Sequence, residues 1–128
     1  MNRSFNPPTV GGPFGAYSHG CEVPQGARWL VIAGQVGAKP EGGFAEGIDA
    51  QCEWALRNVV EVLRAGNMGP PDLVKLLVCL SDQAYVPNWR AAREKVMGDV
   101  KPPATLIVVP ALARPEYLVE VEGWAAKV

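Results

Sequence analysis

The spacing of hydrophobic residues changes along the chain and predicts its elements in turn. The first fourteen residues are rich in proline and glycine, so we expect them to be irregular. Residues 28–33 form an apolar run between two glycines, which predicts a strand paired with residues 17–23 through a tight turn. From residue 46 to residue 65 apolar side chains recur every three to four positions up to Gly66, which predicts an amphipathic helix.

The second half of the chain repeats this alternation of strand and helix. Residues 73–80 are almost all apolar, as in a strand buried on both faces. Pro87 suits the first turn of a second helix, and Gly98 suits its end. Residues 105–128 then predict two strands in a hairpin, with Arg114 in the turn. This order predicts an α/β (α+β) fold, in which a mixed sheet carries two helices on one face. Because apolar residues occur on both faces of several strands, we expect oligomerisation to cover the other face.

Two carboxylates interrupt the last predicted strand. The alternation of a strand places Glu120 and Glu122 on the same face, between Leu118 and Trp124. A buried carboxylate without a partner costs several kcal/mol. These acids are therefore expected to reach solvent, to find a hydrogen-bond donor, or to line a cleft.

Composition and charge limit the class of protein. The 128 residues are enough for one domain over residues 1–128 with its own core. No apolar run approaches the ~20 residues of a membrane span, and the N-terminus lacks an apolar signal segment, so we expect a soluble cytoplasmic protein that does not bind membranes. Twelve basic and thirteen acidic residues leave no basic excess of the kind that nucleic-acid binding requires, so we expect no nucleic-acid partner.

The cysteines and the only histidine give no metal motif. Cys21, Cys52 and Cys79 are far apart and include no C-x-x-C pair, so we interpret them as reduced core residues rather than metal ligands or nucleophiles. His19 either titrates near a cleft or is a hydrogen-bonded strand residue, and the second case is the commoner one. No metal site is predicted.

Several short motifs, each weak alone, occur in a specific order between residues 13 and 126. They are Gly15-Ala16-Tyr17-Ser18, Ala33-Gly34-Gln35, Asn58-Val59-Val60 followed by Ala65-Gly66, Asn88, Pro103-Ala104 and Val119-Glu120-Val121-Glu122. In this order and spacing the chain resembles the YjgF-like or Rid (reactive intermediate deaminase) family. The resemblance implies a chorismate-mutase-like fold and a homotrimer that binds small-molecule ligands in clefts at the subunit interfaces.

The resemblance also implies a reaction and a set of site residues. Active members hydrolyse enamines and imines such as 2-aminoacrylate to a keto acid and ammonia, without a cofactor. By position, the resemblance assigns Glu120 to the glutamate that positions or activates water, and Tyr17 to the aromatic residue of the site. The remaining implied ligand contacts are Ala33, Gly34, Asn88 and Thr105.

Thr105 departs from the pattern of the active members, which have arginine at this position. Arginine offers a planar fork of donors to a carboxylate, whereas threonine offers one neutral hydroxyl. Loss of a charge-assisted hydrogen bond weakens an anionic ligand by roughly 10- to 100-fold. A carboxylate-bearing imine is therefore a poor candidate substrate unless another cation takes this place. The candidates for that cation are Arg3, Arg28, Lys39 and Arg114.

Three functions remain open on the sequence. The first is a hydrolase or deaminase of altered substrate, in which Glu120 positions water and Thr105 bonds a neutral or amide-like group. The second is a non-catalytic trimeric metabolite-binding or regulatory protein that uses the same clefts. The third is a ribonuclease or translation inhibitor, as older labels of the family imply, and the lack of a basic groove argues against it.

Overall fold

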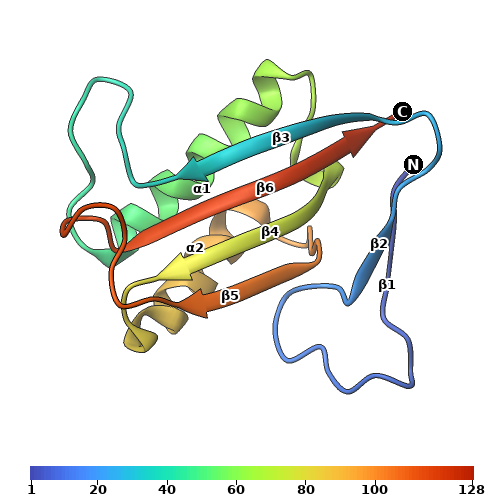
Figure 1. Cartoon of the computed structure of the whole chain (residues 1–128), viewed down its shortest axis with the longest axis horizontal. Coiled ribbons are helices and arrows are strands. Elements are labelled where there is room, and N and C mark those ends of the chain that lie inside the picture. The colour runs from blue at the N-terminus through green and yellow to red at the C-terminus, as the bar shows by residue number, and fades with distance from the viewer.

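The computed structural model describes all residues from Met1 to Val128. A four-stranded mixed sheet carries two α-helices on one face, and a short two-stranded hairpin stands apart from it (Figure 1). Strand β5 runs parallel to β4, whereas the other neighbours in the sheet are antiparallel. The predicted fold class is thus confirmed. In spatial order the strands are β3 (Arg28–Gln35), β6 (Val119–Lys127), β4 (Leu73–Leu80) and β5 (Ala104–Val108).

Both predicted helices are present. Helix α1 (Ile48–Ala65) begins two residues after the expected start and ends at Gly66, as predicted. Helix α2 (Val86–Met97) has proline in its first turn and ends at Gly98. Single 3₁₀ turns, η1 (Pro70–Asp72) and η2 (Gln83–Tyr85), precede β4 and α2. Neither helix has the length and apolarity that a membrane crossing requires.

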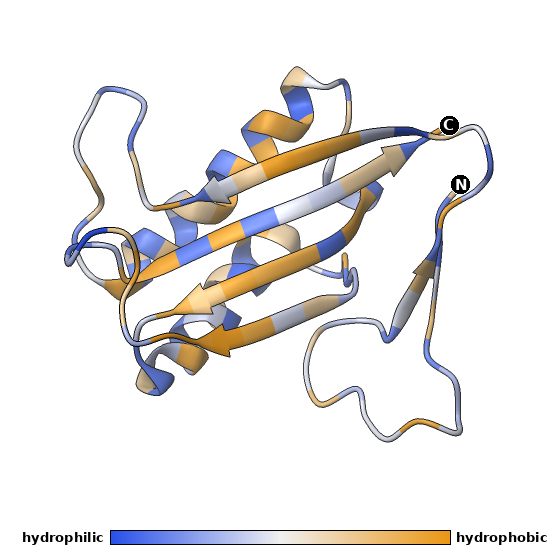
Figure 2. Cartoon of the chain, in the orientation of Figure 1, coloured by the Kyte–Doolittle hydropathy of each residue, from blue (hydrophilic) through white to orange (hydrophobic).

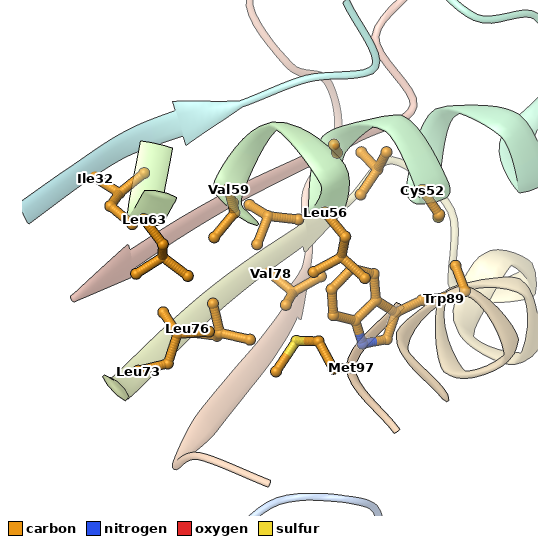
Figure 3. Close-up of a cluster of buried hydrophobic side chains, with 14 of the residues drawn as sticks. Ile32, Cys52, Leu56, Val59, Leu63, Leu73, Leu76, Val78, Trp89 and Met97 are labelled. Atoms are coloured by element: carbon orange, nitrogen blue, oxygen red, sulfur yellow. The ribbon is translucent and has the colours of Figure 1, made fainter. Parts of the chain in front are cut away.

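The core lies between the helices and one face of the sheet. Figure 3 shows Leu56 and Val59 of α1 meeting Val78 of β4 and Trp89 of α2. Along β4 the burial alternates, so that Leu76, Val78 and Leu80 are buried while the residues between them are only half-buried. The expectation that this strand is buried on both faces is therefore wrong for the single chain, because helices cover only one face.

The N-terminal segment differs from the prediction. Strand β1 (Arg3–Phe5) pairs antiparallel with β2 (Gly20–Glu22), so the first fourteen residues are not all irregular. The predicted pairing of residues 17–23 with residues 28–33 is also wrong, because β3 pairs with β6. Strand β6 has nine residues and pairs with β3 along most of its length, whereas β2 has only three residues and could form a much shorter ladder.

The predicted hairpin of the last two strands is wrong as well. Strand β4 lies between β5 and β6 and pairs with both (Figure 1). The connection between β5 and β6 is long enough to cross β4, and the central position buries the most apolar strand of the chain. Arg114 lies in this connection, where its Nη1 is 3.7 Å from Oε1 of Glu116.

Candidate functional site

The face of the sheet without helices, which we call the open sheet face, carries both predicted acids. Glu120 and Glu122 are half-buried there, and Figure 2 shows hydrophilic bands crossing β6 among apolar ones. In register, Glu120 lies opposite Cys79 and Glu122 opposite Leu77. Neither acid forms a salt bridge within the chain. The surrounding residues of this face are Trp29 and Val31 of β3, Lys75 of β4, Trp124 of β6, and Thr105 and Ile107 of β5.

The side chain of Glu120 lies directly against Gly34 of the neighbouring strand. A β-carbon built at Gly34 would be 2.1 Å from Oε2 and 2.8 Å from Cδ of Glu120. The ladder between β3 and β6 is irregular between Ile32 and Gln35, and such a bulge changes the direction of the strand locally. The structure therefore brings Glu120 against Gly34, next to Ala33 in the same strand.

Thr105 has a cation beside it that the sequence analysis missed. Nζ of Lys75 donates a hydrogen bond to Oγ1 of Thr105 at 2.7 Å. Lys75 is half-buried and forms no salt bridge. The sequence does mark this residue, since Lys75 is the only charged residue of the apolar run 73–80 and lies on the same strand face as Leu77 and Cys79.

The four cations considered from the sequence lie elsewhere. Arg3 pairs with Glu22 at 3.4 Å, and Nη2 of Arg28 donates to the carbonyl oxygen of Asn67 at 3.3 Å. Lys39 lies in the loop after β3, and Arg114 lies in the connection before β6. The hydroxyl of Thr105 thus receives its hydrogen bond from Lys75 and from none of these residues.

The three cysteines are free, and they occupy different environments. Only Cys52 is a core residue, and its burial raises the pKa of the thiol to about 12. Cys79 is half-buried on the open sheet face, where partial burial and then the charges of Glu120 and Glu122 raise the pKa of its thiol. Because nucleophilic attack requires the thiolate, Cys79 is a poor nucleophile at neutral pH.

Tyr17 and Asn88 do not lie on the open sheet face of their own chain. Tyr17 belongs to the segment between β1 and β2, and its hydroxyl accepts a hydrogen bond from the backbone N–H of Phe14 at 3.2 Å. Asn88 donates to Oδ1 of Asp49 at 2.7 Å and so links the two helices. His19 precedes β2, and its Nδ1 is buried without a hydrogen-bond partner.

Comparisons with known proteins agree with this architecture. A family model described as Endoribonuclease L-PSP matches residues 10–127. YyfB from Yersinia pestis, a Rid family protein of unknown function, has 33% sequence identity and a TM-score of 0.86, with 98% of each chain covered. No curated protein matches the chain.

Two more distant solved structures share the fold alone. RidA from the Antarctic bacterium Psychrobacter is 24% identical, with a TM-score of 0.72 over 96% of this chain and 98% of that one. TdcF from E. coli, solved with bound serine, is 19% identical, with a TM-score of 0.75 over 98% and 99% of the two chains. The fold and the nearly complete match to the family model define a protein of the L-PSP class. The chain belongs to the Rid/YjgF-like family.

Proposed function

We propose that the protein is a cofactor-independent hydrolase or deaminase of the Rid type that acts on a small C=N compound other than 2-aminoacrylate. The observation that carries this proposal is the position of the Glu120 carboxylate, which lies against Gly34 on the same face as the hydrogen-bonded Lys75 and Thr105. This arrangement offers one acid for proton transfer and one polar pair for substrate binding.

Glu120 acts as a general base and then as a general acid in the proposed reaction. It accepts a proton from water while the water oxygen bonds to the imine carbon, and it passes this proton to the imine nitrogen. As the C–N bond of the resulting carbinolamine breaks, Glu120 takes the hydroxyl proton and gives it to the departing nitrogen, so that ammonia leaves and the hydroxyl oxygen becomes the carbonyl oxygen. Imine and water thus give a carbonyl compound and ammonia, with no change in oxidation state that would require a redox cofactor.

The pair formed by Lys75 and Thr105 supports an altered substrate. An ammonium group is a point charge, whereas an arginine presents a fork that matches both oxygens of a carboxylate. Here the ammonium group already donates to the threonine hydroxyl, so the pair suits a single oxygen acceptor such as an amide carbonyl. The unpaired charges of Glu120 and Glu122 on the same face disfavour an anionic substrate further.

We also propose that three chains, each folding as one domain over residues 1–128, form a cytoplasmic homotrimer with substrate clefts between subunits. Exposed apolar residues on the open sheet face support this assembly, since Trp29 is 56% and Val31 is 67% exposed. In this arrangement Tyr17 and Asn88, which lie away from Glu120 of their own chain, reach the cleft from a neighbouring subunit. The three free cysteines are consistent with a reducing compartment.

A turnover panel tests the proposed reaction. Neutral imines, enamines and cyclic amides are incubated with the wild-type protein, with Glu120→Gln, and with Glu41→Gln as a control in an exposed loop. We expect ammonia release from at least one compound, a loss of about 100-fold or more in Glu120→Gln, and no change in the control. An undiminished rate in Glu120→Gln would contradict the role of this residue.

A non-catalytic metabolite-binding function is the alternative, and the serine bound to TdcF supports it. This alternative predicts no turnover anywhere in the panel but a saturable rise in melting temperature with one of the compounds. A ribonuclease function has less support, because the net charge is −1 and twelve basic residues are offset by thirteen acidic ones. Salt-dependent RNA binding together with cleavage would favour it.

A further inference from the structure

A cavity of about 580 Å³ lies on the helix-bearing side of the sheet, away from Glu120. Its volume is within the range of small-molecule sites. Helix α2 and the segment Phe14–Tyr17 form its walls, together with the chain between Gly98 and Pro102. Its floor is apolar and comes from alternate residues of two strands, namely Leu76, Val78, Ala104 and Leu106.

Five charged side chains line this cavity without forming a salt bridge in the chain: Arg90, Arg93, Glu94, Asp99 and Lys101. Three are cationic and two are anionic, so the cavity has an excess of one positive charge. The excess favours an anionic ligand over a neutral or cationic one.

Arg93 is the buried cation of this group. It is only 6% exposed, and its guanidinium donates to the carbonyl oxygens of Gly98 and Val100. These bonds come from Nη1 and Nη2, so Nε has no acceptor in the chain. Burial lowers the pKa of Arg93, and the charge of Glu94 offsets this only in part. A buried guanidinium that lacks a bonded carboxylate is a favourable site for an external one.

We propose that this cavity binds a small amphipathic monocarboxylate. The carboxylate accepts hydrogen bonds from Arg93, with Arg90 and Lys101 contributing positive charge. The apolar body of the ligand packs against the strand floor and Trp89, which also lines the cavity. Phe14, 82% exposed at the rim, is placed to cover the bound ligand. The site lies on the other face of the sheet from Glu120, and Tyr17, at its wall, is the only lining residue that the proposed reaction also uses.

Calorimetric titration with three matched probes tests the site: 3-phenylpropionate, its neutral amide and the corresponding amine. We expect saturable binding of the carboxylate with a dissociation constant of about 1 mM or tighter, as is reasonable for a ligand of about ten heavy atoms. The amide is expected to bind at least about 10-fold more weakly, and the amine more weakly still. Equal affinity for carboxylate and amide, or no saturable binding of the carboxylate, would overturn the proposal.

Variants place the binding in this cavity. Arg93→Gln removes the buried cation, and Ala104→Phe fills the cavity from the strand floor, so both are expected to abolish binding of the carboxylate. Ala104→Phe decides the question if Arg93→Gln does not fold. Glu120→Gln and Thr105→Val, on the other face, serve as controls and are expected to bind as the wild type does. Binding that survives in Ala104→Phe, or that is lost in the two controls, would place the ligand elsewhere, whatever the turnover panel shows.

Discussion

At the residue scale, the position of the Glu120 carboxylate depends on Gly34 in the adjacent strand. The space that a β-carbon would occupy at Gly34 is taken by the carboxylate group, which therefore lies against backbone instead of extending over a side chain. The backbone conformation does not require glycine here, since the φ angle of Gly34 is not positive. Glycine is required because the Glu120 side chain approaches the backbone so closely. This contact gives a physical reason for finding glycine and glutamate at these two positions of the motifs.

Gly34→Ala is predicted to impair activity with little effect on stability. The added methyl group displaces a flexible, half-buried side chain, so the free energy of unfolding should change by less than about 1 kcal/mol. A displacement of about 1 Å at a catalytic group can reduce the rate about 100-fold. Ammonia release and urea unfolding measure the two effects, and Gly69→Ala, which meets only Pro71 at 3.6 Å, is the matched control. A fully active Gly34→Ala protein would show that the contact does not position Glu120.

The residues of the site were only partly predictable. Glu120 and Gly34 belong to motifs that the sequence displays, and the structure places them in contact. Lys75 was missed because it occurs in a run interpreted as buried, and its neighbour Thr105 is thirty residues away in the chain. Such a contact depends on which strands are neighbours in the sheet, and residue spacing alone does not predict the order of the strands.

At the scale of elements, the helices were predictable and the strand pairings were not. Helix α1 follows from local periodicity and from the glycine that ends it. Strand β6 instead pairs with residues about 40 to 50 positions away on one side and about ninety on the other. The turn-rich segments before β3 and before β6 suggested local hairpins, but longer ladders with distant strands bury more apolar surface.

Gln51 connects helix α1 to the segment that leads into β6. Its Nε2 donates to the carbonyl oxygen of Glu116, and its Oε1 accepts from the N–H of Leu118, both at 2.9 Å. Gln51 is only 5% exposed, so Gln51→Ala leaves two backbone groups without these partners. We expect the free energy of unfolding to fall by about 2–4 kcal/mol, measured by chemical denaturation. Gln83→Ala, at an exposed position, should be neutral, and an equal effect of both variants would contradict this role.

At the scale of the whole molecule, the open sheet face predicts self-association. Apolar residues on β3 and β5 are exposed there, including Val31 at 67% and Ile107 at 42%. Sedimentation equilibrium should give three times the mass of one chain. Val31→Asp should shift the equilibrium toward the monomer, because a charge buried in the interface lacks a partner. The exposed loop variant Glu41→Gln should remain trimeric, and a monomeric wild-type protein would contradict the proposed interface clefts.

The rate of hydrolysis of 2-aminoacrylate tests whether the threonine at position 105 determines the class of substrate. A serine dehydratase generates the enamine, and pyruvate formation is followed with and without the protein. We predict a rate below about one tenth of that given by an arginine-bearing relative at the same concentration, since Lys75 and Thr105 lack the fork of an arginine. Thr105→Arg should raise the rate. A wild-type rate equal to that of the relative would contradict the proposed change of substrate.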